Sequence, residues 1–208
     1  MQYLTGDRAI DALEKCIKES DPNRRYFIDF DFTLLLASST DEYLQSARPS
    51  FLFRPFLKLL GLVRPWVFRG RNGVFLYRDA TRLNVMQKLR PALSSDFEGI
   101  ARERFALKKN DKLLQMLEAV DPSKITIVSF GLKDAIRAML KGSQLESCDI
   151  VASSQKDLVT DRRNGKIQML EAAQCLPDRT GDVIITDSDH DDRDLLEYVE
   201  HGFHIEWL

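Results

Sequence analysis

A short apolar segment near the start of the chain runs directly into two aspartates, in the order Tyr26-Phe27-Ile28-Asp29-Phe30-Asp31. Its short length and its aromatic and β-branched residues favour a buried strand over a helix. Because side chains alternate along an extended chain, Asp29 and Asp31 should point to the same side. Carboxylates at the end of a buried strand are costly unless a cation or hydrogen bonds offset them. The segment predicts a strand that ends at a charged site; the alternative is an ordinary Asp-Thr turn.

Further short apolar segments follow along the chain, and helical patterns separate most of them. The expected strands span 26–30, 125–128, 149–152, 182–186 and 203–207. The expected helices span 5–18, 78–89, 96–107, 111–120, 133–140, 167–175 and 192–200, with a polar turn at 161–165. Strands that alternate with helices predict βαβ units. The fold class is therefore α/β, a Rossmann-like core with a parallel sheet flanked by helices.

About ninety residues after the first strand contain no convincing strand pattern. The chain is therefore expected to divide into a core, residues 1–37 and 121–208, and an inserted helical cap, residues 38–120. Within the insert, Pro55, Gly61 and Pro65 interrupt an apolar segment, which predicts short or kinked helices there.

The composition limits the classes of protein that the chain can represent. Its 208 residues are 44% hydrophobic and 30% charged, which is typical of a soluble globular protein, and the net charge of −2 argues against general nucleic-acid binding. The three cysteines are far apart and match no zinc spacing, so we expect reduced thiols and a cytoplasmic location. Residues 1–19 do not resemble a signal peptide, and no apolar stretch is long enough to span a membrane.

Polar residues follow three of the predicted strands. They are Asp29, Asp31 and Thr33, then Ser129, then Asp187, Ser188 and Asp191. Because parallel strands place their carboxyl ends at one edge of a sheet, these groups could converge there, where the carboxylates would suit a hard divalent cation. Lys166 follows Asn164-Gly165 at the expected start of a helix. This inventory of nucleophile, acid, hydroxyl, cation and metal ligands suits phosphoryl transfer through an aspartyl-phosphate.

The ordered set resembles the haloacid dehalogenase-like superfamily, in particular its phosphatases with a helical cap. The matching motifs are Asp29-Phe30-Asp31-Phe32-Thr33, the strand that ends at Ser129, Lys166, and Thr186-Asp187-Ser188-Asp189-His190-Asp191. The resemblance covers roughly residues 25–208. The chain is also similar to phosphatase-like domains that occur alone or fused to prenyltransferase-type membrane enzymes.

The resemblance implies a role for each matching residue. Asp29 would attack phosphorus, and Asp31 would protonate the leaving oxygen and then activate water. Thr33 would order the loop after the first strand, and Ser129 and Lys166 would hold the phosphoryl oxygens. Mg²⁺ would be held by Asp29, Asp187 and the backbone carbonyl of Asp31, with Asp191 supporting Lys166 or a metal-bound water.

Two positions depart from the family pattern. Phe32 stands where many members have glycine, and a bulky residue cannot freely adopt a positive φ, so the loop is expected to be modified or the pocket narrowed. Thr186 replaces a common glycine, which is a mild change. Neither departure removes a charged group.

Several of these residues also have simpler interpretations. Ser129 could be an ordinary helix cap, and Lys166 could be a surface lysine, with Lys156 as a competitor for its role. Among the five aspartates of 187–194, Asp187 is the clearest ligand and Asp191 the next. The remaining aspartates of this stretch, Asp189, Asp192 and Asp194, are expected to be solvated or to cap a helix, and His190 is expected to be a surface histidine.

The segment 51–71 is rich in aromatic and basic residues, and residues 43–78 include no aspartate or glutamate. Three interpretations stay open: the apolar face of the cap, a surface that recognises the leaving group, or peripheral contact with an anionic membrane. The last would make the substrate a lipid-linked phosphate.

The sequence predicts a Mg²⁺-dependent phosphatase that hydrolyses a small-molecule phosphomonoester. The alternatives are an inactive phosphate-binding regulatory protein, transfer to an acceptor other than water, or dehalogenation. Asp31 disfavours dehalogenation because a departing halide needs no proton. The sequence does not indicate the identity of the substrate or the oligomeric state.

Overall fold

A computed structural model describes residues 4–5, 7–19, 21–47, 53, 55, 57–59 and 78–206. Its centre is a six-stranded sheet in the order β1-β6-β5-β2-β3-β4, in which every neighbouring pair is parallel. The strands are β1 Leu4–Thr5, β2 Tyr26–Ile28, β3 Ile125–Leu132, β4 Asp149–Ser153, β5 Val183–Thr186 and β6 His201–His204. The predicted α/β class with a parallel, Rossmann-like sheet is confirmed.

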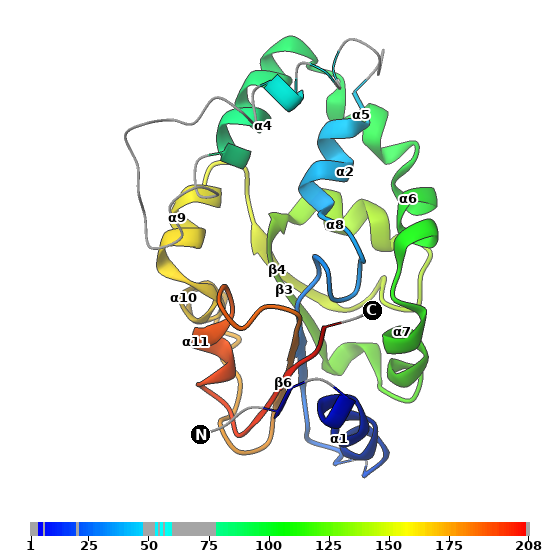
Figure 1. Cartoon of the computed structure of the whole chain (residues 1–208), viewed down its shortest axis with the longest axis vertical. Helices are drawn as coiled ribbons and strands as arrows, with labels where there is room; N and C mark the ends of the chain where they lie inside the picture. Colours follow the sequence, from blue (N-terminus) through cyan, green and yellow to red (C-terminus); the bar gives the residue numbers. More distant parts are fainter. Residues whose placement is uncertain are drawn as a thin grey trace.

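Helices cover both faces of the sheet (Figure 1). One face carries α9 Leu158–Asn164, α10 Lys166–Ala172 and α11 Arg193–Leu196, and the other carries α1 Asp7–Lys18, α7 Asp111–Leu117 and α8 Lys133–Leu140. The alternation of β2 explains this arrangement, because Phe27 packs with Leu170 and Leu195 whereas Ile28 belongs to the larger cluster on the opposite face. The central strands are therefore buried on both sides, as expected for a parallel sheet.

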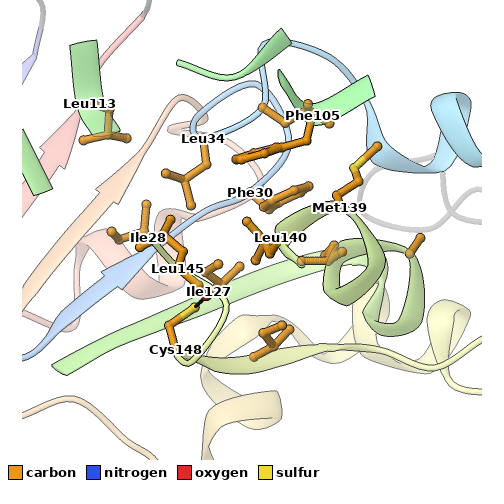
Figure 2. Close-up of a cluster of buried hydrophobic side chains, with 14 of the residues drawn as sticks. Ile28, Phe30, Leu34, Phe105, Leu113, Ile127, Met139, Leu140, Leu145 and Cys148 are labelled. Atoms are coloured by element: carbon orange, nitrogen blue, oxygen red, sulfur yellow. Dashed lines mark hydrogen bonds between the residues drawn. The ribbon is translucent and has the colours of Figure 1, made fainter. Parts of the chain in front are cut away.

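The helices between β2 and β3 lie beyond the carboxyl edge of the sheet or beside it (Figure 1). Those whose bounds the described residues give are α2 Ser39–Gln45, α4 Arg78–Leu89, α5 Leu93–Glu98 and α6 Ala101–Lys108, followed by α7. Phe30 anchors them to the core, since its ring stacks on that of Phe105 with centroids 6.1 Å apart (Figure 2). Phe30 is fully buried, so the residue between the two aspartates faces the core.

The structure changes several predicted boundaries. The first helix begins at Asp7 rather than at residue 5, because Leu4 and Thr5 pair with Phe203 and His204 as an edge strand. The expected helix 96–107 is divided into α5 and α6, with Gly99 as the C-cap of α5. The polar turn predicted at 161–165 is wrong, because Leu158–Asn164 forms α9.

The division into a core and a cap at 38–120 stays a prediction. Leu36 donates its amide to the carbonyl of Lys108, and Asn110 donates its amide to that of Leu34, so the returning chain pairs with the loop after β2.

The membrane-contact prediction for 51–71 concerns residues that lie almost entirely outside the described ones. Within the described ranges, no helix combines the length and the apolar character needed to cross a bilayer.

Candidate active site

The carboxyl end of β2 brings Asp29 to a buried lysine. Nζ of Lys166 lies 2.7 Å from Oδ1 of Asp29, and the lysine side chain is only 2% exposed. The same Nζ lies 2.7 Å from Oδ1 and 2.8 Å from Oδ2 of Asp192. One cation therefore serves two carboxylates, which offsets part of the cost of burying them.

The backbone explains how Lys166 reaches the site. Gly165 has φ +92° and precedes the first turn of α10, and a Cβ there would lie 2.5 Å from Oδ2 of Asp194. That same Oδ2 accepts the amide of Ile167, so Asp194 caps α10 as the helix-capping prediction proposed. Lys166 is the first residue of α10, whereas Lys156 is exposed in the connection between β4 and α9.

The charges in this group shift one another's pKa values. Burial raises the pKa of Asp29, the charges of Asp192 and Asp187 raise it further, and Lys166 opposes the shift. Burial alone would lower the pKa of Lys166, but the charges of Asp192 and Asp29 outweigh it, so its pKa is above the ordinary value. Lys166 is thus a permanent cation at neutral pH, and Asp29 lies where a second cation would lower its pKa.

Asp31 lies in a different environment from Asp29. Its Oδ1 accepts the amide of Ser39 at 2.7 Å, at the start of α2. Burial raises the pKa of Asp31 to about 6, while hydrogen bonds from Ser39 and the charge of Arg162 oppose the shift. A carboxyl group with this pKa can hold or release a proton near neutral pH, which a general acid and base must do.

Thr33 connects the loop after β2 to the end of β5. Its hydroxyl donates to Oδ1 of Asp187 at 2.9 Å and accepts the amide of Asp187 at 3.0 Å. Burial raises the pKa of Asp187, and the hydrogen bond from Thr33 opposes that shift. A ring nitrogen of His204, in β6, also lies 2.9 Å from the carbonyl oxygen of Asp187. Asp187 is therefore held from both neighbouring elements.

Ser129 lies in β3, beside β2, and its hydroxyl accepts the amide of Gly131 at 2.9 Å. Gly131 has no room for a side chain, because a Cβ would lie 2.5 Å from Oγ of Ser39 and 3.2 Å from Oγ of Ser129. Ser129 is therefore packed close to the residue that holds Asp31. Because the oxygen of Ser129 accepts this hydrogen bond through a lone pair, its hydroxyl proton can still be donated to another group.

The acidic loop after β5 does not place its residues as the sequence suggested. Asp191 is exposed, and its Oδ1 lies 3.2 Å from Nδ1 of His190. Asp192 is 1% exposed, contacts Lys166 and also accepts a hydrogen bond from the hydroxyl of Thr186. The expectation that the Asp192 side chain is solvated or caps a helix is wrong, because its carboxylate is directed to the buried Lys166 and makes no capping hydrogen bond at the start of α11. With five aspartates in eight residues, the sequence had no signal to select this one.

Phe32 adopts φ 60°, in the left-handed region that a bulky residue was not expected to adopt freely. The residue is 53% exposed. The chain thus keeps the backbone geometry of the loop despite a bulky residue there. Hydrogen bonds on either side hold this geometry, since the amide of Phe32 donates to the carbonyl of Ala37 and Thr33 is tied to Asp187. Strained residues of this kind often occur at functional sites.

Arg162, in α9, was not identified from the sequence. Its guanidinium lies 5.9 Å from the centroid of the Phe130 ring, and Nζ of Lys166 lies 5.4 Å from the same centroid. Arg162 also pairs with the buried Asp79 of α4 at 3.2 Å. It therefore connects the helices between β2 and β3 to the core beside the two aspartates.

The carboxylates around Asp29 determine whether this site suits Mg²⁺. In the part of the chain that the structure describes, no three acidic, histidine or cysteine side chains converge on one point. The predicted ligands Asp29 and Asp187 are close enough for the charge of Asp187 to raise the pKa of Asp29, whereas Asp191 is exposed. The role of the backbone carbonyl of Asp31 stays a prediction. Mg²⁺ commonly uses one or two carboxylates together with water and substrate phosphate, so the pair Asp29 and Asp187 fits.

A known structure shares this fold. A phosphoserine phosphohydrolase-like protein from Francisella tularensis superimposes with a TM-score of 0.54 over 86% of this chain and 85% of its own, at 18% sequence identity. A cytosolic 5′-nucleotidase IIIB bound to cytidine gives a TM-score of 0.49 over 95% of this chain and 77% of its own, at 12% identity.

No family model and no curated protein sequence matches the chain. The first of the two structures confirms the α/β fold, and at this identity it shows the fold alone. The similarity to the domains associated with prenyltransferases stays a prediction, and the function has to be argued from the site.

Proposed function

We propose that the chain is a Mg²⁺-dependent phosphatase that hydrolyses a small-molecule phosphomonoester through an aspartyl-phosphate on Asp29. The observation that carries this proposal is the contrast between two neighbouring carboxylates. Asp29 is held by the buried cation of Lys166, whereas Oδ1 of Asp31 accepts the amide of Ser39 and burial raises the pKa of Asp31 to about 6. A pair of carboxyl groups with different environments is the arrangement that separates a nucleophile from an acid.

In the first step, a carboxylate oxygen of Asp29 attacks phosphorus, and the bond from phosphorus to the leaving oxygen breaks. Asp31 gives its proton to that oxygen, so the leaving group departs as a neutral alcohol. In the second step, Asp31 accepts a proton from water, whose oxygen attacks phosphorus and releases inorganic phosphate and Asp29. The raised pKa of Asp31 suits it to both proton transfers.

The remaining residues hold the phosphoryl group and the nucleophile. Lys166 offers its ammonium to Asp29 and to a phosphoryl oxygen, and Ser129 offers its hydroxyl at the adjoining strand. Asp192 takes the supporting role toward Lys166 that the sequence assigned to Asp191. Mg²⁺, held by Asp29 and Asp187, would neutralise the phosphate charge among the carboxylates.

Phosphate release from a panel of sugar, nucleotide, amino-acid and prenyl phosphates tests the proposal. The assay compares the wild type with Asp29→Asn, each with Mg²⁺ and with EDTA, and uses Asp189→Asn as the matched control because Asp189 is an exposed aspartate of the acidic loop. We expect Mg²⁺-dependent release that Asp29→Asn abolishes without loss of circular dichroism signal, and that Asp189→Asn retains. Release that survives Asp29→Asn, or no release from any substrate while phosphate still binds, would favour a different enzyme or the regulatory alternative.

A further inference from the structure

We infer that Asn110, which lies between the inserted helices and α7, is a positioning residue of the active site. This inference rests on the proposed function and extends it. Asn110 is 3% exposed and lies far from Asp29 in the sequence. Its side-chain amide donates to the carbonyl oxygen of Thr33 at 2.9 Å. Thr33 in turn holds Asp187 through two hydrogen bonds. A chain of hydrogen bonds, buried at Asn110 and partly buried at Asp187, therefore runs from Asn110 to one of the two candidate metal ligands.

The hydrogen-bonding groups of Asn110 divide between two neighbours. Its backbone amide donates to the carbonyl of Leu34 at 2.8 Å, so Asn110 holds two consecutive carbonyl groups of the loop. Its Oδ1 accepts the amide of Leu113 at 3.1 Å and caps α7. Asparagine is suited to this position, because one side chain supplies both a donor for the loop and an acceptor for the helix.

This arrangement matters because the loop holds a strained residue. Phe32, at φ 60°, lies between Asp31 and Thr33, and such a conformation persists only where the surrounding contacts fix it. The donor of Asn110 acts on the next residue along the loop. Loss of this donor should let the loop relax and displace Asp187, whereas loss of the cap should affect α7.

Two substitutions separate these roles. Asn110→Ser keeps an oxygen that can cap α7 but removes the donor to Thr33, whereas Asn110→Ala removes both. Amide hydrogen exchange measured by NMR reports each contact independently of activity: the amide of Asp187 bonds to Thr33, and the amide of Leu113 bonds to Asn110. Asp121→Ala serves as the control, since Asp121 is an exposed cap of a short helix away from the site.

We expect Asn110→Ser to accelerate exchange of the Asp187 amide by about threefold to tenfold, while the Leu113 amide stays protected. We also expect kcat for phosphate release to fall about tenfold with KM within about twofold, because positioning of the reacting groups is lost rather than binding. Asn110→Ala should lose Leu113 protection as well, and Asp121→Ala should change neither exchange at Asp187 nor kcat.

Unchanged exchange at Asp187 in Asn110→Ser would overturn the inference, as would a loss of kcat confined to Asn110→Ala, because the residue would then act only as a cap. Absence of phosphate release from the wild type would contradict the proposed function instead. The exchange of the Asp187 amide would still decide whether Asn110 positions it.

Discussion

Nζ of Lys166 lies 2.7 Å from Oδ1 of Asp29, although the two residues belong to different elements and are 137 positions apart in the chain. The sheet explains the contact, because β2 lies beside β5, Asp29 follows β2, and Lys166 begins α10, which precedes β5. The ion pair is buried, so its removal should have consequences for both folding and activity.

Lys166→Met should destabilise the fold by about 3–5 kcal/mol, because Asp29 and Asp192 would remain buried without their cation. The double variant Lys166→Met with Asp192→Asn should recover part of this loss, since one of the two charges is removed. Urea unfolding measures both effects. Lys156→Met is the matched control, as Lys156 is exposed, and it should stay within about 0.5 kcal/mol of the wild type. Equal stability of Lys166→Met and Lys156→Met would show that the pair is not buried.

Thr33→Val should destabilise the protein by about 1–3 kcal/mol, because Asp187 would lose a donor to its carboxylate and an acceptor for its amide. Thr33→Ser keeps the hydroxyl and should restore most of the stability and of the phosphatase activity. Thermal unfolding and phosphate release, measured on the same preparations, test the two variants. A serine variant no better than the valine variant would mean that the methyl group, and not the hydroxyl, is what Thr33 contributes.

Asp31→Asn should stabilise the protein at alkaline pH. Burial raises the pKa of Asp31 to about 6 in the folded state, above its value of about 3.9 in an unfolded chain. The folded state binds this proton more tightly, so the wild type loses stability as the pH rises from about 4 to about 6. At pH 8 the variant should be more stable by on the order of 1–3 kcal/mol, and near pH 4 the difference should vanish. Unfolding midpoints at the two pH values test this, and a difference independent of pH would contradict it.

Phe32→Gly should be more stable than Phe32→Val by about 1–2 kcal/mol, because only glycine adopts a positive φ without strain and a β-branched residue adopts it least well. Both variants remove the same half-exposed ring, so the comparison isolates the backbone. Chemical denaturation gives the difference directly. If the valine variant equals the glycine variant, the loop does not hold φ 60° in solution.

The sequence predicted the parts of this protein that local patterns determine. The apolar run before Asp29 predicted a strand over 26–30, and β2 spans Tyr26–Ile28, so the strand was found and its end was placed two residues too late. Lys166 was placed at the start of a helix, where α10 begins. The order of strands and helices was sufficient to predict the α/β class.

Long-range contacts explain what the sequence could not predict. Asp192 pairs with Lys166, whereas its neighbour Asp191 lies beside His190. No local sequence pattern distinguishes these two adjacent aspartates. The two-residue strand β1 forms because β6 offers a partner, and its own sequence carries no such signal. Asn110 was hidden for the same reason, since its role depends on a loop that lies 77 positions earlier.

The most direct test of the central claim is a search for the covalent intermediate. Enzyme would be mixed with an aryl phosphate whose leaving group departs without protonation, quenched with acid within milliseconds, and mapped by peptide mass spectrometry. An Asp31→Asn sample would be treated in the same way; with this substrate the first step does not need the proton of Asp31, so the substitution slows mainly the second step. The account predicts a hydroxylamine-sensitive phosphoryl group on Asp29, more abundant in the Asp31→Asn sample. Phosphate release with no phosphorylated protein, or a phosphoryl group on another residue, would contradict it.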